Sequence, residues 1–186
     1  MVCGSRAHAE ALRDEVTDVL APLGLRLSQS KTRVCHIDEG FDFLGFHIQR
    51  RTKRGTARKY VYTYPSKKSL TSVMGKIRRA THRARHRTLA ELLRQVNRVL
   101  RGWCNYFSHG VSSRTFSYLD HFTWWRIVGW LRKRHNGLNW GTLSRRYLPG
   151  WEIRYGSTEM FRPRKVAIVR YRYRGTRIPT PWASEA

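Results

Sequence analysis

The chain has 186 residues and a mass of 22.0 kDa, which is enough for one ordinary domain or two small ones. It carries 37 Lys and Arg residues against 12 Asp and Glu residues, a formal net charge of +25. Aromatic residues make up 12% of the chain, so the composition excludes a disordered basic tail and indicates a folded protein with an anionic partner, nucleic acid first.

The sequence lacks the patterns of membrane and secreted proteins. No run of 18 or more apolar residues occurs, and the first residues do not form the apolar segment of a signal peptide. The three cysteines, Cys3, Cys35 and Cys104, are widely spaced and form no CxxC pair. We therefore expect a cytoplasmic protein with reduced thiols, no membrane contact and no zinc site.

Charge is distributed unevenly along the chain. Residues 1–42 have a net charge of −2, and the remainder has a net charge of +27. Residues 43–90 contain fourteen Lys and Arg residues and no Asp or Glu. We therefore predict one boundary near residue 50 and a second near Pro149, where helical periodicity gives way to alternation.

The first part of the chain predicts a helix followed by β structure. Ser5 is a suitable N-cap, apolar residues follow at helical spacing, and Gly24 can end the helix. Residues 34–37 and 41–46, on either side of a turn at residues 38–40, are typical of a β-hairpin. Residues 59–64 alternate before Pro65 and predict a further strand.

Three longer helices and a short one are predicted next. Ser66 can cap the first, Thr88 and Glu91 fit a capping box that opens the second, and Gly110 interrupts before a third at about residues 115–135. A short helix is predicted at residues 142–148, and residues 151–155 and 166–173 alternate like strands. The predicted fold is mainly α with small β parts (α+β).

The helix at residues 66–87 is the strongest physical signal for nucleic acid. Its apolar stripe faces one way and its cations the other, with no acid between Asp42 and Glu91 to relieve their repulsion. Guanidinium groups can hold phosphate bidentately. The candidate nucleic-acid-binding residues are Lys67, Lys68, Lys76, Arg78, Arg79, Arg83, Arg85, Arg87, Arg101 and Arg114.

Several aromatic residues lie near these cations and could stack on bases. Most of them lie at helical spacing beside Leu and Val, so we favour packing in the core. The residues considered are Trp103, Tyr106, Phe107, Trp124, Trp125 and Trp130. For Arg101, Arg114 and Arg126, near these aromatic residues, a structural role and a phosphate contact both stay open.

Catalytic motifs are absent from the sequence. No adjacent Asp-Asp pair and no Gly-rich phosphate loop occurs, and His82 and His86 have zinc-ligand spacing without a Glu or Cys nearby. We therefore expect no catalysis by this chain alone, no metal site and no cofactor.

Two stretches resemble group II intron reverse transcriptases. The runs LGLRLSQSKTRV at residues 23–34 and GFDFLGF at residues 40–46 look like the end of the palm. Residues 66–148, with RGWCNYF at residues 101–107 and Leu119-Asp120, resemble the maturase-specific domain, also called the thumb or domain X. The resemblance divides the chain into a palm remnant (1–50), a basic linker (51–65), a helical maturase domain (66–148) and a basic β-rich appendage (149–186).

The resemblance implies roles for individual residues. Phe43, Leu44, Gly45 and Phe46 would form the primer grip, a hairpin that holds the 3′ end of the growing strand. Lys31 would match a lysine near the incoming nucleotide, where it could assist proton transfer or be structural. The thumb helices would bind intron RNA and the template–primer duplex.

The chain also departs from the family pattern. The Tyr-x-Asp-Asp motif, whose aspartates hold two Mg²⁺ ions in the complete polymerase, is absent, and so is a C-terminal HNH endonuclease. We therefore expect a C-terminal fragment that acts as an RNA-binding maturase module. Three alternatives stay open: a half of a split RNA-directed DNA polymerase that needs a separate N-terminal half, a DNA-target-binding module, and a decayed fragment without a role.

Overall fold

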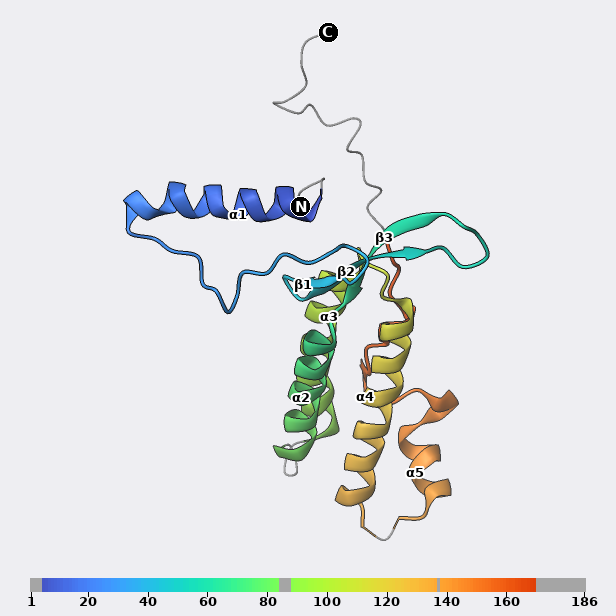
Figure 1. The fold of residues 1–186 in the computed structure, drawn as a ribbon. Coiled ribbons are helices and arrows are strands. Elements are labelled where there is room, and N and C mark those ends of the chain that lie inside the picture. The colour runs from blue at the N-terminus through green and yellow to red at the C-terminus, as the bar shows by residue number, and fades with distance from the viewer. Residues whose placement is uncertain (1–4, 84–87, 137, 170–186) are drawn as a thin grey trace. The chain divides into compact units, whose positions relative to one another are not determined.

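The computed structural model describes residues 5–83, 88–136 and 138–169, without the side chain of Arg83. The described residues form two compact units, one from residue 5 to Phe43 with His47–Tyr62, the other from Leu44–Phe46 with the residues from Thr63 on. Helices dominate, and a three-stranded and a two-stranded sheet accompany them (Figure 1), which confirms the predicted fold class. The domain boundaries at residues 50, 65 and 148 stay predictions.

The first helix begins and ends where its capping residues predict. Helix α1 (Arg6–Leu20) starts at Ser5, whose Oγ accepts a hydrogen bond from the backbone N–H of His8 at 3.4 Å. A 3₁₀ turn, η1 (Ala21–Leu23), follows and stops at Gly24, which has a φ of +69°. In the described structure none of the α1 residues is buried, and Val19 is 71% exposed.

The hairpin turn lies later in the chain than we predicted. Strands β1 (Phe41–Phe43) and β2 (Phe46–Thr52) are joined by Leu44 and Gly45, with φ values of +47° and +81°, and β3 (Lys59–Pro65) completes the sheet in the order β1-β2-β3. Two successive left-handed residues match the twist of paired strands, which favours a two-residue turn at this position. The strand at residues 59–64 is confirmed.

The predicted strand at residues 34–37 is wrong. These residues are irregular, although the predicted turn at residues 38–40 does form, because the carbonyl of His36 accepts from the N–H groups of Glu39 and Gly40. The carboxylate of Asp38 binds the guanidinium of Arg50 at 2.6 and 2.9 Å. This contact lowers the pKa of Asp38 to about 2 and ties the segment to β2 as a loop.

Four α-helices dominate the described part of the second unit, and the N-caps of the first two agree with the sequence, whereas the short helix predicted at residues 142–148 begins two residues earlier, after Asn139. Helix α2 (Lys67–Arg83) is capped by Ser66, and α3 (Leu89–Phe107) by the capping box of Thr88 and Glu91. Helices α4 (Ser113–Arg134) and α5 (Trp140–Tyr147) follow. Helix α2 packs against both α3 and α4 (Figure 1), and the fully buried side chains include Ile77, Leu92, Leu93, Val96, Leu100, Leu119, Ile127 and Leu131.

Beside the main hydrophobic core, a smaller aromatic cluster joins the start of β2 to the helices. Phe46 lies with its ring centre 4.7 Å from that of Phe107, which is buried beside Phe116. Gly110 allows the chain to approach closely here, because a Cβ at this position would lie 2.9 Å from the carbonyl oxygen of Thr63. The interruption predicted at Gly110 therefore marks a close backbone contact.

The segment after α5 is less regular than we predicted. It contains η3 (Pro149–Trp151), β4 (Arg154–Tyr155), β5 (Thr158–Glu159) and η4 (Pro163–Lys165). The predicted strand at residues 166–173 is wrong over 166–169, where the chain is irregular, and its remainder lies outside the described residues. Val166 and Ile168 pack on the aromatic cluster instead of pairing with a strand.

Two buried polar contacts attach this segment to the helices. The side-chain amide of Asn97 donates to the carbonyl of Glu159 and accepts from the N–H of Phe161, both at 2.7 Å. The carboxylate of Asp120 binds the guanidinium of Arg162 through two hydrogen bonds of 2.9 Å, and their side chains are only 6% and 11% exposed. These two contacts attach the segment to the helices, and its residues Ile153 and Met160 lie in the same hydrophobic core as the helices.

We predict that Asp120→Ala destabilises the helical unit by about 3 kcal/mol, because removing one partner leaves a buried guanidinium without its counter-charge. Denaturant unfolding followed by tryptophan fluorescence measures this, since every Trp lies at or after residue 103. Glu10→Ala, which breaks an exposed pair with Arg6 in α1, is the control and should leave the fluorescence midpoint unchanged. An Asp120→Ala chain with the parent midpoint would contradict this role.

Candidate nucleic-acid interface

The outer face of α2 carries cations, while its inner face is buried in the core. The side chains of Val73 and Ile77 are 2% and 1% exposed. The guanidinium of Arg78 lies 5.1 Å from the ring centre of Phe122 on α4, which holds it near the surface between the two helices. The exposed cations of α2 are Lys67, Lys68, Lys76, Arg78 and Arg79.

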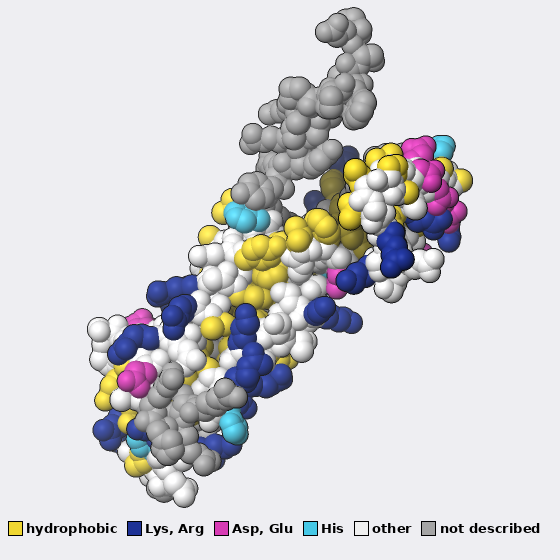
Figure 2. Space-filling view, turned by 90° about the vertical axis from the view of Figure 1, so that its left-hand side faces the viewer, with side chains coloured by type: hydrophobic (Ala, Val, Ile, Leu, Met, Phe, Trp, Pro, Cys, Tyr) yellow, Lys and Arg dark blue, Asp and Glu magenta, His cyan; other side chains and the backbone are white. Residues whose placement is uncertain are grey.

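Figure 2 views the molecule from the side on which α2 lies in Figure 1. Among the charged side chains on the lower part of this surface, Lys and Arg predominate over Asp and Glu. The lower part of this surface is therefore mainly basic.

The described acidic side chains of the helical unit form hydrogen bonds or ion pairs with other groups of the same unit. Each carboxylate has a partner within the unit: Glu91 the N–H of Thr88, Asp120 the guanidinium of Arg162, Glu152 the ammonium of Lys165, and Glu159 the guanidinium of Arg154. The hydrogen bond from Lys165, at 2.9 Å, lowers the pKa of the Glu152 carboxyl. Within the helical unit, no described carboxylate therefore forms an ion pair with an α2 cation, and an external anion could neutralise these cations.

A second row of cations lies on α3. Arg94, Arg98 and Arg101 are exposed and follow one another at separations of four and three residues along the helix. The guanidinium of Arg101 lies 5.6 Å from the ring centre of Phe161. Our sequence analysis named Arg101 and missed Arg94 and Arg98. Their spacing on the polar side of the predicted helix was the signal that could have found them.

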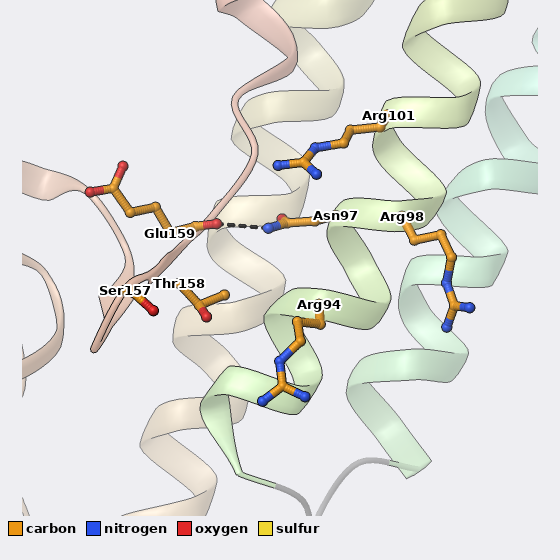
Figure 3. Close-up of a pocket in the computed structure, with 7 residues that line it drawn as sticks. All are labelled: Arg94, Asn97, Arg98, Arg101, Ser157, Thr158 and Glu159. Atoms are coloured by element: carbon orange, nitrogen blue, oxygen red, sulfur yellow. Dashed lines mark hydrogen bonds between the residues drawn. The ribbon is translucent and has the colours of Figure 1, made fainter.

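A groove lies between α3 and the turn that joins β4 to β5. Its volume is about 390 Å³, and it is lined by Arg94, Asn97, Arg98, Arg101, Ser157, Thr158 and Glu159 (Figure 3). Arg101 extends toward the β4–β5 side of α3, whereas Arg98 leaves the side of α3 on which α2 runs.

The polar groups of the groove suit a phosphate. Asn97 is already bound to the carbonyl of Glu159, and the carboxylate of Glu159 lies 3.1 Å from Arg154. Guanidinium and hydroxyl donors therefore remain as the groups that face a ligand, and a phosphate oxygen is the acceptor that guanidinium binds best.

The remaining predicted cations lie in different places. Arg114 is exposed in the first turn of α4. Arg126 is half-buried, and its guanidinium donates to Thr81 Oγ1 at 2.9 and 3.2 Å, so it links α4 to α2. Arg83 is the last residue of α2, and its side chain lies outside the described structure. Arg85 and Arg87 lie outside the described residues.

The residues predicted to form a primer grip lie at the β1–β2 turn. Phe43 and Leu44 are 58% and 69% exposed, whereas Phe46 packs on Phe107. The turn is fixed from the helical unit, because Tyr106 Oη donates to the carbonyl of Leu44 at 2.7 Å and the N–H of Ser66 donates to that of Gly45 at 2.8 Å. The backbone of Leu44 is strained by its positive φ.

Lys31 is exposed in a turn after α1, in which its N–H donates to the carbonyl of Ser28 at 3.0 Å. Among the described residues no group of three or more His, Cys, Asp or Glu side chains could hold a metal ion. No helix in the described part of the chain combines the length and apolar character needed to cross a bilayer.

Three of the six aromatic residues considered in the sequence analysis pack inside the protein, and Trp124 packs against the core while partly exposed. Phe107 and Trp130 are 3% and 5% exposed, and Trp103 Nε1 donates to Ser69 Oγ at 3.2 Å beside them. The packing interpretation is therefore correct for these three. Tyr106 and Trp125 are 51% and 52% exposed.

The helical part of the chain is similar to known proteins. Residues 70–148 match the family model of the group II intron maturase-specific domain. Protein YkfC of Escherichia coli (strain K12) is 38% identical over 85 residues, an alignment that covers 42% of this chain and 22% of that protein. The match supports a maturase-specific domain at α2–α5, and this chain spans about a fifth of the length of its relative.

We predict that Lys76→Gln with Arg79→Gln reduces the salt dependence of binding to a structured RNA. Each lost phosphate contact should lower the slope of log Kobs against log salt by about 1. Filter binding between 50 and 300 mM KCl measures the slope. The matched control is Arg6→Gln with Arg13→Gln, which removes two charges from α1, where both are paired with carboxylates. Equal slopes for the two double variants would remove α2 from the interface.

Proposed function

We propose that this chain is the RNA-binding maturase module of a group II intron reverse transcriptase, and that it assists folding and splicing of the intron RNA. One observation carries the proposal: the cations of α2 and α3 have no carboxylate to neutralise them in the described structure. They lie mostly within the residues that match the maturase-specific domain. The ligand that this surface suits is a folded polyanion.

The proposed action is electrostatic and involves no bond-making by the protein. A folded RNA brings phosphate groups of distant strands close together, and their repulsion opposes folding. Cations at fixed positions on two neighbouring helices lower this repulsion and release condensed counterions. A helical face reads RNA by shape and by its backbone phosphates, so the specificity comes from the intron fold.

We extend the proposal to a template–primer duplex through the β1–β2 turn. Phe43 and Leu44 are exposed at the turn, whereas Gly45 faces the helices, because a Cβ there would lie 3.4 Å from the ring of Phe107. Tyr106, which holds the turn, belongs to α3. The proposed primer grip and the proposed RNA surface therefore share a helix.

We predict that Arg94→Gln with Arg101→Gln weakens binding to intron RNA by about tenfold at 0.15 M salt, because two phosphate contacts are lost. In vitro splicing is then measured at a Mg²⁺ concentration at which the intron alone is inactive. The parent chain should restore splicing, and the double variant should need a correspondingly higher protein concentration.

Arg6→Gln with Arg13→Gln again provides the control with equal charge. Parallel competition with duplex DNA tests the DNA-target alternative, which assigned the binding to a trailing segment of which residues 170–186 lie outside the described structure. A parent chain that binds duplex DNA better than intron RNA would refute the maturase proposal.

The exposed apolar side of α1 favours a second candidate function, completion of a polymerase by a separately encoded palm. Leu12, Val16 and Val19 are 39%, 40% and 71% exposed and lie on one side of the helix. An apolar partner surface would remove this area from water.

We predict that this chain extends a primer only when a separately produced palm half with the Tyr-x-Asp-Asp motif is added. Val16→Asp should abolish the extension, because a charge would be buried at the contact. Val61→Asp, an exposed position on β3, serves as the control. Primer extension by this chain without the palm half would contradict the expectation that the chain has no catalytic activity of its own.

A further inference from the structure

Four tryptophans form a cluster at the surface of the helical unit, and three of them are exposed. This cluster, which we call the tryptophan platform, consists of Trp124 and Trp125 on α4, Trp140 on α5 and Trp151 on η3. Trp151, Trp125 and Trp140 are 63%, 52% and 42% exposed, and Trp124 is half-buried beneath them. Burial in the core therefore does not account for the rings of Trp125, Trp140 and Trp151, whereas Trp124 packs against the core and contacts Trp125 and Trp151.

The rings contact one another and are held in position. Trp124 lies with its ring centre 4.9 Å from that of Trp125 at 86°, and 6.1 Å from that of Trp151 at 44°. Trp140 lies 6.4 Å from Trp151 at 38°. Hydrogen bonds fix two of the indoles: Trp125 Nε1 donates to His121 Nε2 at 2.8 Å, and Trp124 Nε1 donates to the carbonyl of Trp151 at 3.0 Å.

Trp151 adopts a backbone conformation that large side chains rarely adopt. Its φ is +63°, directly after Gly150 at +60°. A left-handed conformation costs free energy for any residue with a Cβ, and here it carries a side chain that is mostly in water. The strain presents the indole at the surface, where a ligand could use its face.

The charge around the platform favours a nucleic acid over an apolar protein surface. Residues 121–151 contain six Lys and Arg residues and no Asp or Glu. Arg132 and Lys133 at the end of α4 and Arg145 and Arg146 at the end of α5 are exposed. Glu152, the next acid in the chain, is bound by Lys165.

The surface beside Trp125 is open. Gly129 lies one turn further along α4, and no atom lies within 4 Å of the position that its Cβ would occupy. A side chain at this position would lean back toward Trp125. Glycine in a helix interior costs stability, and the open space that it leaves has room for a planar ring next to the indole.

We propose that the tryptophan platform binds unpaired nucleobases of a single-stranded RNA segment, by stacking them on exposed indole faces while the neighbouring cations hold the phosphates. Stacking on aromatic side chains together with backbone cations is the physical basis of single-strand binding. The proposal rests on the proposed function for the nature of the ligand and adds a second kind of contact to it. The α2 and α3 cations would bind base-paired, structured RNA, and the platform would bind the unpaired bases of RNA segments outside the RNA helices.

The test compares a ten-nucleotide oligoadenylate with an abasic strand of equal length and charge, by fluorescence anisotropy with the full chain. We expect the base-bearing strand to bind at least about tenfold more tightly. Trp125→Ala with Trp151→Ala should weaken its binding by roughly 5- to 100-fold. Binding of the abasic strand and of a duplex RNA should change less than twofold.

Two control variants accompany this measurement. Trp125→Phe with Trp151→Phe keeps two aromatic faces and should retain most of the affinity for oligoadenylate. Tyr60→Ala removes a ring that is 43% exposed on β3, outside the platform, and should leave the preference for the base-bearing strand intact.

The unmodified protein provides a readout that does not depend on the variants folding. Crosslinking with an oligonucleotide that contains 4-thiouridine, followed by mass spectrometry, should label peptides that contain Trp125 or Trp151. Labels confined to α2 and α3 would overturn the proposal, as would equal affinities of the parent chain for the base-bearing and abasic strands.

The remaining outcomes also separate the two proposals. Duplex binding without a base-dependent gain removes the platform and leaves the proposed function standing, whereas no binding to any strand or duplex removes both. A dimer in gel filtration that Trp151→Ala dissociates, with oligoadenylate binding unchanged, would assign the platform to a contact between copies of the chain.

Discussion

The helical core of α2, α3 and α4 determines where the charges of this unit can lie. Each of these helices buries one face, with Ile77, Val96 and Ile127 at most 1% exposed. The charged side chains of these helices must therefore lie on their other faces. Burial of apolar side chains is the dominant favourable term in folding, and it can hold a surface whose cations repel one another. An anion that binds this surface reduces the repulsion between the cations, and this reduction adds to the free energy of binding.

The described carboxylates of the helical unit stabilise its own structure. Asp120 holds η4 through Arg162, Glu91 caps α3, and Glu152 and Glu159 pair with neighbouring cations. A mixed surface would have spread these acids among the outward cations and neutralised them. Their use within the structure leaves the described α2 and α3 cations available to a ligand, which a maturase-specific domain at residues 70–148 would need.

The backbone strain in the described residues is found at two candidate contact points. Leu44 and Trp151 are the non-glycine residues with positive φ in this part of the chain, and both expose most of their side chain. Each conformation costs about 1–2 kcal/mol. The surrounding structure holds both: Tyr106 binds the carbonyl of Leu44, and Trp124 binds that of Trp151. Strain maintained at exposed apolar residues is typical of positions that a ligand uses.

The sequence by itself determined the helices, their caps at Ser5, Ser66 and Thr88, and the separation of cations from apolar residues on α2, because these depend on neighbours within four positions along the chain. It also carried the resemblance to the maturase-specific domain. Only the tertiary structure decided that the hairpin turns at Leu44, that Arg126 is tied to Thr81, and that the groove joins Arg94 and Arg101 to the β4–β5 turn. It likewise decided that Trp151 meets Trp124 and Trp140 on the surface. These features depend on residues between 11 and more than 60 positions apart, whose proximity comes from packing and leaves no periodic pattern in the chain.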